Sequence, residues 1–111
     1  MVVPSVFNEN HFFISKSTKM LIIAQHDIQD PKAFWSTAQS LNAMMPEELR
    51  LLSVFPSKDM KTGTCIWEAP SADIVQQFID KHVGHFSKNY CYEVDEVNAM
   101  GMPKRTLEAT L

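Results

Sequence analysis

Three histidines are the residues of this chain whose type and placement could most readily do chemistry. His26 ends an apolar segment, and His82 and His85 stand three residues apart near the end of an amphipathic segment. In the topology derived below, all three come to the same end of the domain, with Asp27 nearby. Three imidazoles and a carboxylate could hold Zn²⁺ or Ni²⁺. Alternatively, one of the imidazoles could act as a general base toward a small molecule.

Each of these histidines also has a purely structural interpretation. His82 falls on the apolar stripe of its segment, as a histidine at the edge of a core does. His85 stands near a helix C-terminus, where a positive charge is favoured, and His26 could simply close a strand. Because a spacing of three residues is common in helices, the pattern leaves the metal site, the catalytic base and the structural role all open.

Three aromatic residues are candidate ligand contacts. Trp67, Tyr90 and Tyr92 lie in segments of strand-like composition and could line a cavity for an aromatic or acyl ligand. Aromatic side chains on such strands also often belong to the core. Glu68, beside Trp67, would need a partner on an inner face, so it is either exposed at the strand end or functional. Of the two, we expect it to be exposed.

The two cysteines are predicted to be free. Cys65 and Cys91 fall on strands that the predicted sheet separates by a third strand, so their backbones should be about 10 Å apart. A disulfide requires Cα atoms within about 7 Å of each other. We therefore expect two buried thiols, and two such cysteines without a CxxC motif indicate a reduced, cytoplasmic protein.

Two helices and four strands are needed to position these residues. The apolar run that begins at Met20 is typical of a central strand buried on both faces. Asp30 followed by Pro31 is a helix-start signal, and Ser71 after Pro70 is another. The sequence predicts strands over residues 20–26, 49–55, 63–69 and 89–97, and helices over 31–45 and 71–83.

The order strand–helix–strand–strand–helix–strand predicts an α+β, ferredoxin-like βαββαβ fold. Its antiparallel sheet has the order 4-1-3-2, with both helices on one face. The other face would expose apolar side chains, and pairing two such faces about a two-fold axis would bury them, so we expect a homodimer. The predicted organisation is an N-terminal arm (1–19), the ferredoxin-like domain (20–98) and a C-terminal tail (99–111).

The composition limits the possible partners. The 111 residues are 45% hydrophobic and 21% charged, which is typical of one globular domain. A formal net charge of −3 without a basic cluster gives no indication of nucleic-acid binding. No apolar run approaches the roughly 20 residues of a membrane helix. The N-terminus has no signal-peptide pattern.

Two segments, CIWEAPSADIVQQFID and NYCYEVDEVNAMGMP, resemble a group of small, uncharacterised ferredoxin-like proteins. More broadly, residues 20–103 are similar in pattern to the dimeric α+β-barrel superfamily. That superfamily includes stress-responsive barrel proteins, cofactor-independent monooxygenases of the antibiotic-biosynthesis type, and small isomerases and cyclases. The segment from His82 to His85 resembles a histidine segment of the stress-responsive proteins, although the proline usual there is missing.

Together, these patterns predict binding of a small, partly hydrophobic molecule in a cavity of the sheet. A cofactor-independent reaction there would use His82, His85 or His26 as base. The first alternative is a Zn²⁺- or Ni²⁺-binding protein that uses the same three histidines, and the second is a dimerisation module without catalytic activity. No phosphate loop, GxSxG or HExxH motif occurs, so nucleotide-binding and standard hydrolase functions have no support.

Overall fold

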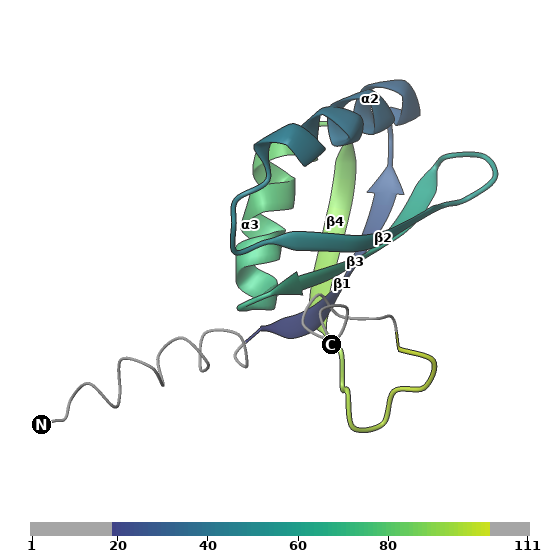
Figure 1. The fold of residues 1–111 in the computed structure, drawn as a ribbon. Helices are drawn as coiled ribbons and strands as arrows, with labels where there is room; N and C mark the ends of the chain where they lie inside the picture. Colours follow the sequence, from purple (N-terminus) through teal and green to yellow (C-terminus); the bar gives the residue numbers. More distant parts are fainter. Residues whose placement is uncertain (1–18, 103–111) are drawn as a thin grey trace, which may run out of the picture.

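The structure is a computed structural model that describes residues 19–102. The predicted N-terminal arm, apart from residue 19, and the predicted tail beyond residue 102 lie outside this range. In chain order the elements are β1 (Met20–Ile28), α2 (Pro31–Leu41), the short 3₁₀ helix η1 (Asn42–Met44), β2 (Arg50–Pro56), β3 (Thr62–Ala69), α3 (Ala72–Val83) and β4 (Ser87–Glu93) (Figure 1).

The four strands form one antiparallel sheet in the order β2-β3-β1-β4. This order and the positions of the two helices confirm the predicted ferredoxin-like α+β fold. The apolar run that begins at Met20 is the central strand, since β1 pairs with β3 on one side and with β4 on the other. Figure 1 shows α2 and α3 on the same side of the curved sheet.

The side chains of β1 alternate between the two faces of the sheet. On the helix-facing side Met20 is partly buried, and the later side chains are buried, namely Ile22, Ala24, His26 and Ile28. Gln25 and Asp27, on the opposite side, are exposed. β1 continues two residues past its predicted end, so His26 does not close the strand. It lies within the strand and faces the helices.

Both helices begin where the sequence predicts, because their capping residues form the expected bonds. The Asp30 carboxylate accepts a hydrogen bond from the Ala33 N–H at 3.1 Å, and Pro31 occupies the first helical position. The Ser71 hydroxyl accepts one from the Ile74 N–H at 3.2 Å. These bonds satisfy backbone donors that the first turn of a helix leaves without a partner.

Two further elements, α2 and β4, also end at other residues than predicted. α2 stops at Leu41 and the chain continues as η1 rather than as the same helix to residue 45. β4 begins at residue 87 and ends at Glu93, not at residue 97. Beyond it, the Asp95 carboxylate accepts hydrogen bonds from the backbone N–H groups of Val97 and Asn98 at 3.1 and 3.3 Å. Such local bonds compete with strand pairing and turn the chain away from the sheet.

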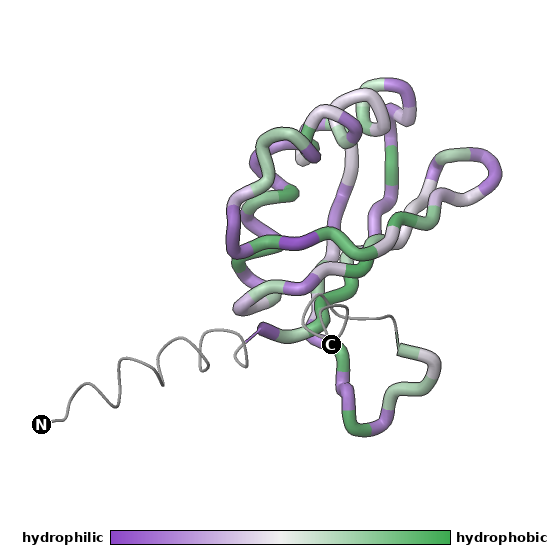
Figure 2. The backbone as a smooth tube through the Cα atoms, viewed as in Figure 1, coloured by the Kyte–Doolittle hydropathy of each residue, from purple (hydrophilic) through white to green (hydrophobic). Residues whose placement is uncertain are grey.

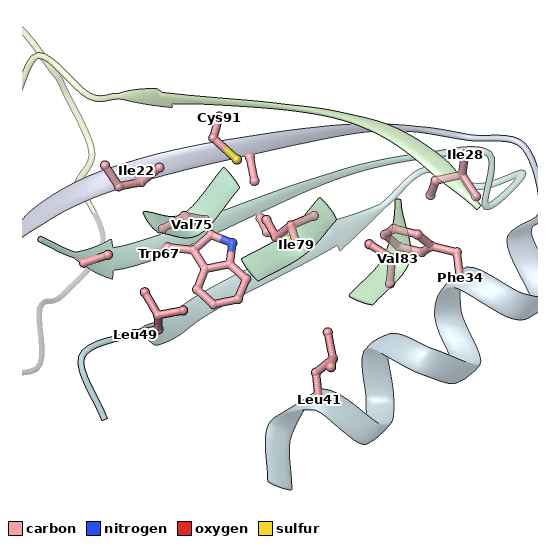
Figure 3. Close-up of a cluster of buried hydrophobic side chains, with 13 residues drawn as sticks. Ile22, Ile28, Phe34, Leu41, Leu49, Trp67, Val75, Ile79, Val83 and Cys91 are labelled. Carbon is pink, nitrogen blue, oxygen red and sulfur yellow. The ribbon is translucent and has the colours of Figure 1, made fainter. Parts of the chain in front are cut away.

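The hydrophobic core lies between the helix-facing side of the sheet and the two helices. Figure 3 shows the buried side chains that meet there, among them Ile22 and Trp67 from the sheet, Phe34 and Leu41 from α2, and Val75, Ile79 and Val83 from α3. Figure 2 shows hydrophobic residues in the strands near the centre of the sheet and hydrophilic residues at the tip of the hairpin between β2 and β3. Among residues 19–102, no helix has the length and apolar character needed to cross a membrane.

The opposite face of the sheet carries exposed aromatic side chains. Phe55 is 58% exposed and Tyr90 is 63% exposed. In the strand register, Phe55, Thr64, Gln25 and Tyr90 form one row across the sheet. The ring of Tyr92 lies beside that of Tyr90, with 5.6 Å between the ring centroids. We call this surface the open face.

Two isoleucines on α3 allow a matched test of this core. Ile79 is 3% exposed and Ile74 is 36% exposed. We expect Ile79→Ala to lower the free energy of unfolding by about 2–5 kcal/mol, because it removes buried methylene groups and leaves a cavity. Ile74→Ala should cost less than about 1 kcal/mol. Urea unfolding measures both, and equal losses for the two variants would contradict this packing.

Candidate functional site

The site is built around His26, whose imidazole is only 5% exposed. The ring packs against Phe34 of α2 with 5.1 Å between the centroids. Across the sheet, His26 is paired with Asn89 of β4 and with Gly63 of β3. One of the three histidines that the sequence singled out for chemistry is therefore held inside the domain, between the central strand and the first helix.

Asn89 determines which nitrogen of His26 carries the proton. The Asn89 amide nitrogen donates to the Asp80 carboxylate at 3.0 Å, so the amide oxygen faces His26. That oxygen lies 2.7 Å from His26 Nδ1. Because a carbonyl oxygen can only accept a hydrogen bond, Nδ1 carries the hydrogen. The other ring nitrogen, Nε2, is left with its lone pair whenever the imidazole is neutral.

Two further side chains fix Asn89 and Asp80 in place. Gln76 of α3 donates both to the second oxygen of the Asp80 carboxylate at 3.0 Å and to the Asn89 backbone carbonyl at 2.8 Å. The Ser87 hydroxyl lies 2.8 Å from the Asn89 side-chain oxygen. α3 and β4 thus hold the asparagine with its oxygen toward the imidazole, and the ring cannot easily turn.

Cys65 is the partner of the other imidazole nitrogen. Its Sγ atom lies 3.3 Å from His26 Nε2, and its side chain is 7% exposed. Burial lowers the pKa of His26, although the Asn89 hydrogen bond and the Asp80 charge act in the opposite direction. Burial also raises the pKa of the Cys65 thiol to about 12. Near neutral pH the two groups are therefore an uncharged pair, in which the thiol donates to the imidazole.

His26 and Cys65 both line a cavity of about 350 Å³ between the helices and the sheet. This volume is at the lower end of the range of small-molecule pockets. Most of its walls are apolar, and they include Phe34, Ala38, Leu41, Leu51, Ile79 and Val83. None of the described residues that line it is charged. The cavity therefore suits an uncharged and largely apolar molecule.

Trp67 lines this cavity and carries a buried polar group without a partner among the described residues. Its side chain is 4% exposed, and its indole Nε1–H has no hydrogen-bond partner among the described residues. In Figure 3 the indole nitrogen lies on the side of the ring that faces Ile79, which lines the same cavity. A buried donor without an acceptor is costly, because the group has lost its bonds to water and gained none. An acceptor on a bound molecule would remove this cost.

Trp35 connects α2 to the β2–β3 hairpin at the rim of the cavity. Its indole N–H donates to the Met60 carbonyl in the β2–β3 hairpin at 3.0 Å, and both residues line the cavity. A Cβ atom at Gly63 would lie 3.1 Å from Cη2 of this indole, so the glycine lets the ring approach β3 closely. Val54 and Met60 are each 40% exposed, which places the mouth of the cavity beside the hairpin.

The open face has a second, shallow hollow of about 440 Å³, whose lining includes residues His26 and Asn89. Gln25, Asp27, Thr64, Lys88 and Tyr90 line it. It is larger than the cavity between the helices and the sheet but less enclosed, and its lining includes the charged side chains of Asp27 and Lys88. Enclosure excludes water and strengthens polar contacts, so the smaller cavity is the better candidate site.

The structure does not bring the three predicted histidines together. His82 is half-buried with its ring 4.6 Å from that of Phe78, while His85 is exposed. Neither lines the cavity that contains His26. Within residues 19–102, no three His, Cys, Asp or Glu side chains form a group that could hold a metal ion.

The three predicted aromatic contacts are also divided between two surfaces. Trp67 lines the enclosed cavity, but Tyr90 and Tyr92 lie on the open face. Strand alternation separates them, since the register places Tyr90 opposite Gln25 and Trp67 opposite Ile22. Glu68 is 5% exposed, so the prediction that it is exposed was wrong.

Sequence reasoning did not assign a role in chemistry to Cys65 or Asn89. It predicted that both cysteines are free and buried, and this is confirmed. Cys65 and Trp67 are two residues apart on β3, so alternation alone puts them on one face. Only the register of β3 and β4 against β1 shows that this face also contains His26 and Asn89.

Comparison of the chain with protein-family models, with curated proteins and with solved structures finds no match.

The buried imidazole predicts a pH dependence of stability. Below about pH 6.5, the unfolded chain protonates this histidine while folded His26, whose pKa is lowered, stays neutral. The unfolded state then binds more protons, so the free energy of unfolding falls as the pH falls through this window. His26→Gln should remove that part of the slope. Urea unfolding at pH values on either side of 6.5 measures the free energy of unfolding of both proteins. The same change with pH in the parent protein and in His26→Gln would contradict a lowered pKa for His26.

Proposed function

We propose that the protein binds a small, uncharged and largely apolar molecule carrying a hydrogen-bond acceptor, in the cavity between α2, α3 and the sheet. The observation that supports this most directly is Trp67, which lines the cavity and whose buried indole N–H has no partner among the described residues. The apolar walls favour burial of a hydrophobic group. The uncharged imidazole of His26 and thiol of Cys65, which also line the cavity, do not require a charged ligand.

Two probes of similar shape test this proposal. Acetophenone carries a carbonyl acceptor, and ethylbenzene does not. We expect acetophenone to shift the Trp67 indole N–H signal in an NMR titration. The Trp35 indole N–H should respond much less, because it already donates to the Met60 carbonyl. Ethylbenzene should bind more weakly and leave the Trp67 N–H without an acceptor.

A Trp67→Phe variant provides the control, since it keeps an aromatic ring and removes the donor. It should weaken acetophenone binding roughly 2- to 10-fold, as expected for one neutral hydrogen bond. The affinity for ethylbenzene should change less. If neither probe perturbs the resonances of residues that line the cavity, the cavity does not bind ligands of this class and the proposal fails.

We also propose that the open face pairs with that of a second copy to form a homodimer. Phe55 and Tyr90 are more than half exposed there, and Ile23 and Ile66 are half-buried beside them. Exposed apolar surface of this kind is typical of an interaction site. A two-fold axis through the face would let each copy cover the same residues of the other. The pattern similarity to the dimeric α+β-barrel superfamily supports the same arrangement.

The mass of the particle in solution tests the dimer. We expect Phe55→Glu together with Tyr90→Glu to shift the particle from dimer to monomer in sedimentation equilibrium, because both changes would place charges in the interface. Ile74→Glu on the helical side is the control and should leave the mass unchanged. A monomeric parent protein at high concentration would exclude the dimer.

A further inference from the structure

The uncharged pair formed by Cys65 and His26 has the arrangement of a nucleophile with its base. His26 Nε2 lies 3.3 Å from Cys65 Sγ, and Nδ1–H donates to Asn89 Oδ1 at 2.7 Å. The Asn89 amide is in turn anchored by Asp80. A nucleophile within hydrogen-bond reach of a base, with that base oriented by a third group, is the general pattern of nucleophilic catalysis.

The second cysteine shows that this arrangement is specific to one thiol. Cys91 is also a buried, free thiol on the helix-facing side of the sheet, and burial raises its pKa to about 12 as well. It does not line the cavity, and no described imidazole is bonded to it. Burial alone therefore does not distinguish Cys65. Its contact with His26 and its access to the cavity do.

We propose that Cys65 is a catalytic nucleophile and His26 its general base, in acyl transfer from small, uncharged esters or thioesters with an apolar acyl group. This inference rests on the proposed binding function, because the acyl group would occupy the same apolar cavity. The carbonyl oxygen of such a substrate is an acceptor of the kind that the Trp67 N–H lacks. Two independent features of residues that line one cavity, a thiol hydrogen-bonded to an imidazole and a buried donor without a partner among the described residues, thus fit one class of substrate.

The chemistry proceeds in two balanced halves. Cys65 Sγ forms a bond to the carbonyl carbon while its proton passes to His26 Nε2, and the carbonyl π electrons move to the oxygen. The carbonyl then re-forms, the bond to the leaving alcohol or thiol breaks, and that group takes the proton from Nε2. Water next attacks the Cys65 thioester with His26 again accepting a proton. The carboxylic acid leaves, and the Cys65 thiolate regains its proton from His26.

The raised pKa of Cys65 is compatible with this mechanism. A thiol that stays protonated does not react readily with dissolved electrophiles, because the thiolate is the reactive form. Removal of the proton during attack avoids the need for a free thiolate. His26 stays neutral and can accept the proton because burial lowers its pKa. The pair is thus inert until a carbonyl carbon is held beside the sulfur.

Acylation by p-nitrophenyl butyrate tests the proposal on the full chain. Intact-protein mass spectrometry should detect one butyryl group, and peptide mapping should place it on Cys65. We expect the adduct in Cys91→Ala as in the parent protein, and none at position 65 in Cys65→Ala. His26→Gln should slow acylation of Cys65 by roughly 100-fold or more, as expected for loss of a general base. Circular dichroism verifies that each variant is folded.

Three results would overturn the inference. They are acylation of lysines alone, acylation of Cys65 and Cys91 at similar rates, and an unchanged rate of Cys65 acylation in His26→Gln. Acetophenone binding, measured through the Trp67 indole signal in Cys65→Ala, separates this inference from the proposed function. If acetophenone binds and Cys65 is not acylated in the parent protein, the cavity is a binding site without this chemistry. If neither occurs, both proposals fail.

Discussion

The pairing of β1 with two neighbours in fixed register is the constraint on which the rest of the structure depends. Because β1 is central, each of its helix-facing side chains has a neighbour on both sides, so His26 stands opposite Asn89 and diagonally across from Cys65. A shift of either pair by one residue would turn the histidine or its partners to the opposite face. The apolar side chains of β1 resist such a shift, since Ile22, Ala24 and Ile28 would lose their places in the core.

The same pairing makes it possible to bury the polar side chain of His26 within the domain. An imidazole taken out of water without partners would be costly. Here that cost is reduced by the hydrogen bond to Asn89 and by the negative charge of Asp80, both of which favour the protonated ring. Desolvation still dominates and keeps the ring neutral. The balance leaves His26 uncharged but held in one orientation.

The tertiary arrangement divides the predicted functional residues into two surfaces with different properties. The helix-facing side combines an enclosed apolar cavity with a few buried polar groups, which is the character of a small-molecule site. The open face combines exposed aromatic rings with a shallow hollow that Asp27 and Lys88 help to line, which suits contact with another protein surface. Neither surface includes His82 or His85. The His82 ring packs against Phe78, and His85, which follows α3, is exposed to solvent.

Local patterns in the sequence determined the elements of this protein and the order of its strands. The caps at Asp30 and Ser71 fixed the helix starts, and the apolar run after Met20 identified the central strand. Element ends were less predictable, since the turn at Asp95 depends on side-chain bonds to the backbone. The contact of His26 with Cys65 and Asn89 was decided by tertiary structure alone. Cys65 and Asn89 are 39 and 63 positions away from His26 along the chain. Only the register between strands brings such distant residues within bonding distance.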